Sequence, residues 1–232
     1  MHSATSSSHD SRSSLMPRDT PTVFVVDDDI SVRESLEALI RFAGWQPQTF
    51  ASAQEFLSRP RVFVPCCLVL DVTLPDLNGL ELQKRLATDR IDMPIIFITG
   101  HGDVPMTVRA MKAGALEFLT KPCSDEVLLS AIQQAIECSC AALRREAEMR
   151  AIRDPYASLS RRERQVMGLV VRGLLNKQVG GVLGISEITV KAHRGSVMRK
   201  MQANSFADLV NMAARLYLVS TAEHRQVNRT PS

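Results

Sequence analysis

Short apolar runs alternate with amphipathic segments through the first half of the chain. Apolar runs at 23–26 and 67–70 are typical of strands buried on both faces of a sheet, and further strands are expected at 95–98 and 117–119. Apolar residues at helical spacing separate these runs. The alternation predicts a doubly wound, flavodoxin-like α/β domain with a parallel five-stranded sheet. The second of the five strands is expected before 67–70, but the apolar pattern does not locate it.

Capping residues mark where several of the predicted helices begin. A serine followed three residues later by an acidic residue allows each side chain to accept a hydrogen bond from the backbone N–H of the other. This pattern predicts helix starts at Ser31-x-x-Glu34, Ser52-x-x-Glu55, Ser160-x-x-Glu163 and Ser205-x-x-Asp208, and Ser186 is a further expected N-cap.

Beyond residue 124 the pattern is helical only. A helix that begins after Ser124 meets no glycine or proline before Pro155, so we expect it to lead out of the first domain into a linker. Shorter helices are expected at about 160–172, 177–183, 187–201 and 205–218. We therefore predict a disordered Ser-rich leader (1–19), an α/β domain (20–137), a helical linker (138–157), an all-α domain (158–220) and a flexible tail (221–232).

The 232 residues carry a formal net charge of +3 that conceals two opposed parts. Residues 20–137 hold 10 Lys and Arg against 16 Asp and Glu, whereas residues 138–232 hold 16 against 7. A basic domain favours an anionic partner, with nucleic acid the first candidate and a membrane surface the second. No apolar run approaches the roughly 18 residues that span a bilayer. Five irregularly spaced cysteines favour reduced thiols in the cytoplasm.

Polar side chains gather where the predicted strands end. These positions hold Asp27-Asp28-Asp29, Asp71, Thr99 and Lys121. In an open α/β sheet the carboxyl ends of the strands form the ligand crevice, and carboxylates that converge there repel each other unless a cation lies among them. Magnesium suits such a site. A metal-bound Asp can attack phosphorus to give an acyl phosphate whose oxygens Thr and Lys bind, whereas Asp29 is expected to be a solvated loop acid.

The same residues resemble a known family. Val26-Asp27-Asp28-Asp29, Asp71-x-x-x-Pro75-x-x-x-Gly79, Ile98-Thr99 and Lys121-Pro122 resemble the receiver domain of two-component response regulators. The segment 100–106 further resembles the FixJ branch, with its StyR- and TodT-like members. The resemblance assigns the phosphoacceptor to Asp71, magnesium binding to Asp27, Asp28, Asp71 and the Thr73 carbonyl, the switch pair to Thr99 and Phe118, and phosphoryl binding to Lys121.

The basic domain carries a second ordered set of motifs. Leu159-Ser160-x-Arg162-Glu163, Gly173-Leu174-x-Asn176-Lys177-x-Val179, Leu183-Gly184-Ile185-Ser186 and Thr189-Val190-Lys191-x-His193-Arg194 resemble the LuxR-type helix-turn-helix domain. The resemblance implies a scaffold helix at 177–183 and a recognition helix at about 187–201, which fits the major groove of DNA. It places base contacts at Lys191, Ala192 and Gly195, and backbone contacts at Asn176, Lys177, Thr189, Arg194 and Arg199.

Both helices of this motif carry features that bear on how they pack. In the recognition helix, Ile188 and Ala192 are expected on an apolar side that Val190, Val197 and Met201 continue. In the scaffold helix, Gly180 and Gly181 stand where the family usually has Ala and a longer residue, and each glycine costs roughly 0.5–1 kcal/mol. Gly180 either lets the recognition helix approach closely or loosens the domain, and the sequence leaves both open.

The two resemblances together imply a phosphorylation-switched transcription regulator and no enzyme activity. A sensor histidine kinase phosphorylates Asp71, the surface around the fourth helix and fifth strand changes, and receivers form a homodimer. Two reader domains then occupy paired half-sites on double-stranded DNA. The FixJ-branch resemblance favours activation of transcription, with RNA polymerase as a further partner and the cytoplasm as the location.

Two alternatives remain open. A metal-dependent phosphatase of the haloacid-dehalogenase type also forms an aspartyl-phosphate with Thr and Lys helpers. Such an enzyme requires an acid two residues after the nucleophile, where this chain has Thr73, and no cap domain is evident. The other alternative is constitutive DNA binding that needs no phosphate, and the intact acidic set argues against it.

Overall fold

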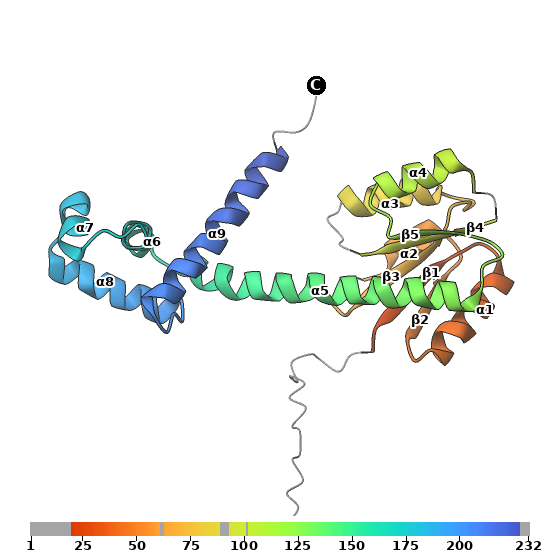
Figure 1. Cartoon of the computed structure of the whole chain (residues 1–232), viewed down its shortest axis with the longest axis horizontal. Coiled ribbons are helices and arrows are strands. Elements are labelled where there is room, and N and C mark those ends of the chain that lie inside the picture. Colours follow the sequence, from red (N-terminus) through yellow and green to blue (C-terminus); the bar gives the residue numbers. More distant parts are fainter. Residues whose placement is uncertain (1–19, 61–62, 89–92, 101, 228–232) are drawn as a thin grey trace, which may run out of the picture. The chain divides into compact units, whose positions relative to one another are not determined.

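The structure is a computed structural model that describes residues 20–60, 63–88, 93–100 and 102–227, the last eleven of these by their backbone only (Figure 1). The predicted leader, His101 and residues 228–232 of the predicted tail lie outside the described residues. The chain divides into two compact units, Met1–Leu143 and Arg144–Ser232. Helix α5 (Asp125–Ala157) begins in the first unit and ends in the second.

The first unit alternates strands and helices along the chain. Its elements before α5 are β1 (Thr22–Val26), α1 (Ile30–Phe42), β2 (Gln46–Phe50), α2 (Ala53–Ser58), β3 (Cys66–Asp71), α3 (Gly79–Thr88), β4 (Ile95–Thr99), α4 (Val104–Lys112) and β5 (Glu117–Thr120). The strands pair in parallel, in the order β2-β1-β3-β4-β5. The predicted doubly wound α/β class with five parallel strands is confirmed.

The sheet separates two apolar layers because successive side chains of a strand point to opposite faces. Val23 and Val25 pack with α1 and α5 on one face, whereas Phe24 and Leu68 pack with α2, α3 and α4 on the other (Figure 1). Strands β1, β3 and β4 are buried along their whole length. Burial on both faces explains why each of these strands is a continuous apolar run.

Strand β2 is the strand that the apolar pattern does not place. Its residues Gln46–Phe50 are polar for the most part, and their side chains are exposed or half-buried. The strand lies at the edge of the sheet and pairs with β1 alone. An edge strand tolerates Pro47 because one row of its backbone groups has no partner strand. Its polar composition therefore follows from its position.

The start of α1 differs from the prediction. The helix begins at Ile30 and not after Ser31, and its N-cap is Asp29, whose carboxylate accepts the backbone N–H of Ser31 at 2.8 Å and its hydroxyl at 2.6 Å. Asp29 is therefore not a freely solvated loop acid, and these bonds hold the pKa of its carboxyl below the usual range. The other expected caps accept the predicted backbone hydrogen bonds: Ser52, Ser160, Ser186 and Ser205.

The second unit is helical throughout its described part. After α5 it contains α6 (Arg161–Val170), α7 (Asn176–Leu183), α8 (Glu187–Lys200) and α9 (Phe206–Val227), whose apolar faces share one core. The all-α prediction is confirmed. Helix α9 continues past 218 and includes residues 221–227 of the tail expected to be flexible, because no glycine or proline interrupts it. None of the described helices is both long and apolar enough to cross a membrane.

Candidate functional site

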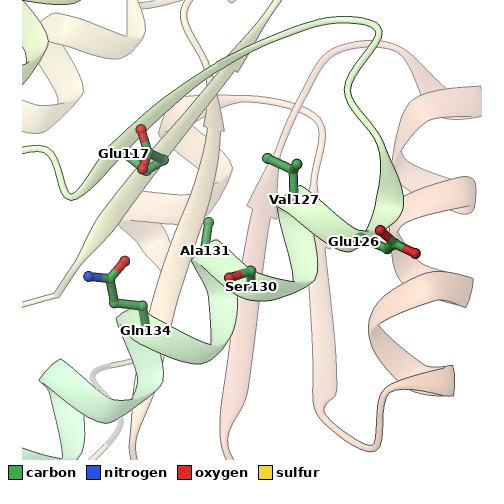
Figure 2. Close-up of a pocket in the computed structure, with 6 residues that line it drawn as sticks. All are labelled: Glu117, Glu126, Val127, Ser130, Ala131 and Gln134. Atoms are coloured by element: carbon green, nitrogen blue, oxygen red, sulfur yellow. The ribbon is translucent and has the colours of Figure 1, made fainter.

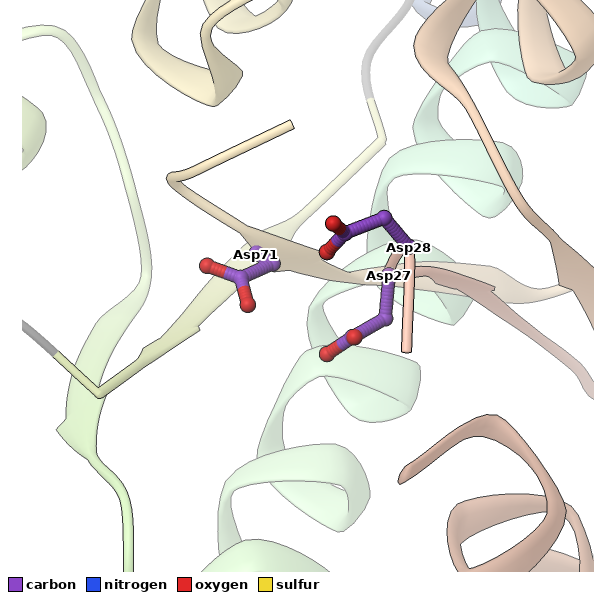
Figure 3. A group of neighbouring side chains, drawn as sticks. All are labelled: Asp27, Asp28 and Asp71. Atoms are coloured by element: carbon purple, nitrogen blue, oxygen red, sulfur yellow. The ribbon is translucent and has the colours of Figure 1, made fainter. Parts of the chain in front are cut away.

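The ends of β1 and β3 bring three carboxylates together. Asp27 and Asp28 follow β1 directly, and Asp71 is the last residue of β3. One oxygen atom from each carboxylate lies within 4.8 Å of the others, and Figure 3 shows the three side chains meeting at the ends of the strands. Because β1 and β3 are adjacent and parallel, their carboxyl ends share one edge of the sheet. The structure therefore assembles the acidic group that the sequence singles out.

Two donors orient the carboxylate of Asp71, which is buried. The backbone N–H of Thr73 donates to Oδ1 at 2.9 Å, and the ammonium of Lys121 donates to Oδ2 at 2.8 Å. Thr73 itself is exposed, two residues beyond the strand. Gly79 is needed beside this strand, because a Cβ there would collide with the backbone carbonyl oxygen of Asp71. The glycine of the motif thus lets α3 begin against the acidic site.

The carboxylate of Asp27 lies deepest in the site. Its Oδ1 accepts the N–H of Asp29 at 3.0 Å, its Oδ2 accepts from Lys121 at 2.6 Å, and Arg33 donates to its carbonyl oxygen at 2.7 Å. Burial raises the pKa of Asp27 in spite of these donors. Burial also opposes the charge of Lys121, but its hydrogen bonds to the two carboxylates outweigh burial and raise the pKa of Lys121. One ammonium therefore holds two buried carboxylates that would otherwise repel.

The group is short of positive charge. The three carboxylates outnumber the two cations beside them, because the Lys121 ammonium binds Asp27 and Asp71 and the Arg33 guanidinium donates to the backbone carbonyl oxygen of Asp27. Asp28 is exposed, whereas Asp27 and Asp71 are buried. Carboxylate oxygens are the ligands that Mg²⁺ prefers, and it is commonly held by one or two of them together with water. The donor set therefore fits a hard divalent cation approached from the solvent side at Asp28.

The expected switch residues lie on the neighbouring strands β4 and β5. Thr99 is buried at the end of β4, and Phe118 is half-buried on β5. The Phe118 ring packs beside Phe97 with centroids 5.9 Å apart. A Cβ at Gly102 would lie 2.9 Å from this ring. The position of the Phe118 ring therefore depends on Gly102, which the sequence analysis includes in the segment 100–106 without giving it a role.

In the second unit, the structure answers the question raised by the two glycines of α7. A Cβ at Gly180 would lie 2.7 Å from the backbone carbonyl oxygen of Ile185, in the turn that precedes α8. Gly180 therefore lets this turn approach α7 closely. By contrast, nothing lies within 4 Å of a Cβ at Gly181, so that glycine lowers helix stability without a packing reason.

The predicted DNA contacts divide into two groups by exposure. Five of these residues are exposed: Lys177, Lys191, Ala192, Gly195 and Arg199. The other three are half-buried: Asn176, Thr189 and Arg194. Arg194 donates to Oδ1 of Asn176 at 3.3 Å and its guanidinium lies 4.9 Å from the centroid of the Phe206 ring. The hydroxyl of Thr189 bonds that of Ser186 at 2.8 Å. The half-buried group is thus held by contacts within the domain.

The expected apolar side of α8 is correct only in part. Val190 and Val197 are fully buried in the core of the unit, but Ile188 is 80% exposed. The reason is geometric, because Ile188 precedes Val190 by two residues and a helix turns by about 200° over that distance. The two side chains therefore point to opposite sides of α8.

Glu163 has a larger role than the capping box that revealed it. Its carboxylate accepts the N–H of Ser160 at 2.7 Å, the hydroxyl of Ser196 at 2.6 Å and the ammonium of Lys200 at 2.7 Å. The hydrogen bonds from Lys200 and Ser196 lower the pKa of Glu163 to about 2. Glu163 therefore joins the start of α6 to the last turns of α8. The sequence signal for this link is a serine and a lysine four residues apart on α8.

Comparison with known proteins agrees with both motif sets. One family model, "Response regulator receiver domain", matches residues 23–133, and another, "Bacterial regulatory proteins, luxR family", matches residues 157–213. Nodulation protein W of Bradyrhizobium diazoefficiens is 53% identical over 196 residues, which cover 84% of this chain and 86% of the relative. Transcriptional regulatory protein FixJ of the same species is 44% identical over 193 residues, 83% of this chain and 94% of FixJ. The solved structure of response regulator StyR has a TM-score of 0.79 at 47% identity, and the match covers 85% of this chain and 100% of that one.

Proposed function

Because the chain belongs to the two-component response regulators that join a receiver domain to a LuxR-type DNA-binding domain, we propose that phosphorylation of Asp71 controls its binding to DNA. The protein is a DNA-binding response regulator. The observation that carries the proposal is the convergence of three carboxylates, among them Asp71, beside the ammonium of Lys121. We propose residues 20–137 as its receiver domain and residues 158–220 as its DNA-binding domain.

The chemistry proposed at Asp71 is transfer of a phosphoryl group from a phosphohistidine of a sensor histidine kinase. A carboxylate oxygen of Asp71 attacks phosphorus, a P–O bond forms, and the P–N bond to the histidine breaks as the imidazole leaves with the electron pair. Asp28, Asp71 and the Thr73 carbonyl would hold the magnesium ion, which would supply positive charge to the phosphoryl oxygens. Asp27 assists from its buried position. Lys121, already 2.8 Å from Asp71, pairs with the new phosphoryl group.

Phosphorylation is proposed to change the α4–β5 surface through Thr99 and Phe118. Helix α4 exposes Val104, Val108 and Met111, which share one face at i, i+4 and i+7. A shallow groove of about 280 Å³ lies where β5 meets α5, lined by Glu117, Glu126, Val127, Ser130, Ala131 and Gln134 (Figure 2). Exposed apolar side chains gathered on one face are typical of an interface. We therefore expect the phosphorylated receiver to form a homodimer through this surface.

The dimer presents two copies of the reader domain to double-stranded DNA. Base contacts are proposed for Lys191, Ala192 and Gly195, and contacts to the DNA backbone for Asn176, Lys177, Thr189, Arg194 and Arg199. Activation of transcription, with RNA polymerase as a partner, is the proposed outcome. The five free thiols and the nucleic-acid partner support a cytoplasmic location.

Replacement of the phosphoacceptor tests this function. Asp71→Asn keeps the size of the side chain but removes the nucleophile, so the variant should bind no phosphoryl group from acetyl phosphate and should remain monomeric by analytical ultracentrifugation. Asp154→Asn, at an exposed aspartate in the second unit, is the matched control and should dimerise as the wild type does. Phosphate-stimulated dimerisation and DNA binding that persist in Asp71→Asn would refute the proposal.

No observation favours the phosphatase alternative. The position that would need its general acid holds Thr73, whose backbone N–H orients Asp71. Turnover of a phosphate ester by the full chain, abolished by Asp71→Asn, would be the result that revives the enzyme.

A further inference from the structure

The exposed face of α8 carries an apolar side chain that the proposed DNA contacts leave out. Ile188 is 80% exposed in the first turn of the helix, next to the exposed acid Glu187 and two residues after the Ser186 cap. At about 100° per residue, it lies at the centre of a solvent-facing stripe. The other members of this stripe are Lys191, Ala192, Gly195 and Arg199, all exposed.

The stripe is shallow around Ile188. Ala192 carries only a methyl group, and Gly195 carries no side chain, with nothing within 4 Å of where one would begin. Lys191 forms an ion pair with Glu187 at 3.3 Å, which directs its chain along the helix toward the first turn. A surface that meets this face of α8 therefore contacts the branched side chain of Ile188 together with an open stretch of helix.

The charge around the stripe indicates a polyanion as the partner. Lys191 and Arg199 lie on the stripe itself, and Lys177 is exposed on the adjacent helix α7. The whole segment 138–232 holds 16 Lys and Arg against 7 Asp and Glu. Such a surface binds the phosphates of DNA, which brings the exposed face of α8 against the edges of the bases.

We propose that Ile188 contacts the methyl group of a thymine in the major groove and so determines base specificity at one position of each half-site. This inference rests on the proposed function, which places α8 in that groove. An aliphatic side chain neither donates nor accepts hydrogen bonds, so Ile188 cannot bind a phosphate oxygen or a guanine edge. Among the features that the four bases present in the major groove, the C5-methyl of thymine is the apolar one. Any other base would place a donor or acceptor without a partner against Ile188.

Replacement of thymine by uracil tests the contact, because uracil pairs as thymine does and lacks only the methyl group. The full chain, phosphorylated with acetyl phosphate, is first used to select its preferred duplex from a random pool. Each thymine of that duplex is then replaced by deoxyuridine, at the equivalent position of both half-sites, and the dissociation constant is measured at one salt concentration. One position should weaken wild-type binding by about fourfold per half-site, the effect expected from losing one buried methyl group.

The variant Ile188→Ala should remove this sensitivity. It should bind the thymine and uracil duplexes with equal affinity at that position, and because Ile188 is exposed the thermal stability should be unchanged. Ile188→Val should keep part of the discrimination. The matched control is Val182→Ala on α7, an exposed apolar residue that should leave the uracil effect of the wild type intact.

The outcomes separate this inference from the function on which it rests. Ile188→Ala that weakens binding equally on both duplexes, or keeps the uracil effect, would show that Ile188 packs against sugar or protein and would overturn the contact. Selection of no preferred sequence by the phosphorylated wild type would overturn specific DNA binding itself, and the contact with it.

Discussion

The link between Glu163 and the recognition helix leads to a quantitative prediction. Glu163→Gln keeps the shape of the side chain and removes its charge. The carboxylate accepts hydrogen bonds from Ser196 and Lys200 on α8 and from the N–H of Ser160 at the start of α6. An amide oxygen accepts more weakly from an ammonium, and an amide nitrogen in place of the second oxygen accepts nothing. The variant should therefore loosen α8 without changing any group on its exposed face.

The size of the effect follows from the pKa of Glu163, which its hydrogen bonds lower from 4.5 to about 2. Each unit of difference between the folded and unfolded pKa is worth about 1.4 kcal/mol, so the carboxylate contributes at most about 3.5 kcal/mol at neutral pH. The side chain of Lys200 is 36% exposed, and solvent screens its share of this interaction. We therefore expect Glu163→Gln to lower the free energy of unfolding of the second unit by about 2 kcal/mol.

Hydrogen exchange of the α8 amides measures this change within the second unit of the full chain. A loss of about 2 kcal/mol should accelerate the exchange of the protected α8 amides by about 30-fold at pH 7. Because the pKa of Glu163 is lower in the folded state, its contribution is complete above about pH 4.5 and disappears as the pH falls from there toward about 2. The difference between variant and wild type should therefore shrink below pH 4.5.

A second acidic residue provides the control. Glu187 begins α8 and forms an ion pair with Lys191 at 3.3 Å, but both side chains are largely exposed. Glu187→Gln should change the same exchange rates by less than about threefold, because exposed ion pairs contribute little. Equal effects of the two substitutions, or a Glu163→Gln effect that persists unchanged at low pH, would refute the assignment of the stabilisation to the buried carboxylate.

Further substitutions test three other parts of the structure. Lys121→Met leaves two buried carboxylates without their ammonium, and should lower the urea stability of the first unit by about 2 kcal/mol, measured by its single tryptophan, with added magnesium restoring part of the loss. Gly102→Ala should displace the ring of Phe118, seen as changed aromatic NMR shifts, and should alter dimerisation in the absence of phosphate. Gly181→Ala should raise the melting temperature through about 0.5–1 kcal/mol of helix propensity, whereas Gly180→Ala should not, because its Cβ meets backbone at 2.7 Å.

For each of these predictions, a control variant or a comparison defines the result that would contradict it. Lys112→Met replaces an exposed lysine of α4, and if it destabilised the first unit as much as Lys121→Met, the loss would not come from the acidic site. Gly100→Ala adds a Cβ with nothing within 4 Å. If this variant also changed the NMR shifts of Phe118, the position of the ring would not depend on Gly102 in particular. An equal gain from both α7 alanines would show that the turn before α8 moves aside freely.

The parts of the fold that the sequence predicts are those in which burial acts on both faces or a motif repeats a fixed spacing. Strands β1, β3 and β4 are recognisable because every side chain is buried, whereas β2 is not, because an edge position allows a polar sequence. The cap at Asp29 was missed because Ser31 fits the same pattern and no local rule chooses between two acceptors so close together. Both misses concern positions where tertiary neighbours decide.

The same limit applies to the candidate sites. The acidic group is predictable because strand ends in a parallel sheet converge by topology, and only residue order is needed to see it. The roles of Glu163 and Gly102 depend on side chains or backbone from distant segments, at 2.6 Å from Ser196 in one case and 2.9 Å from the Phe118 ring in the other. Such contacts follow from packing. The serine and the lysine four residues apart on α8 indicate the Glu163 link only once the packing of α6 against α8 is known.

A comparison of the two buried carboxylate groups explains why one can bind a ligand and the other stabilises the fold. Glu163 is a single carboxylate with one ammonium and two neutral donors, so its charge is balanced and its oxygens are occupied. In the first unit, Asp27 and Asp71 share one ammonium, and the exposed Asp28 adds a third negative charge. A divalent cation would offset that excess, and the phosphoryl group proposed for Asp71 would then lie beside both the cation and Lys121. The acidic group of the first unit, with its excess negative charge, can therefore bind a cation, whereas the oxygens of Glu163 are already occupied and its charge is already neutralised.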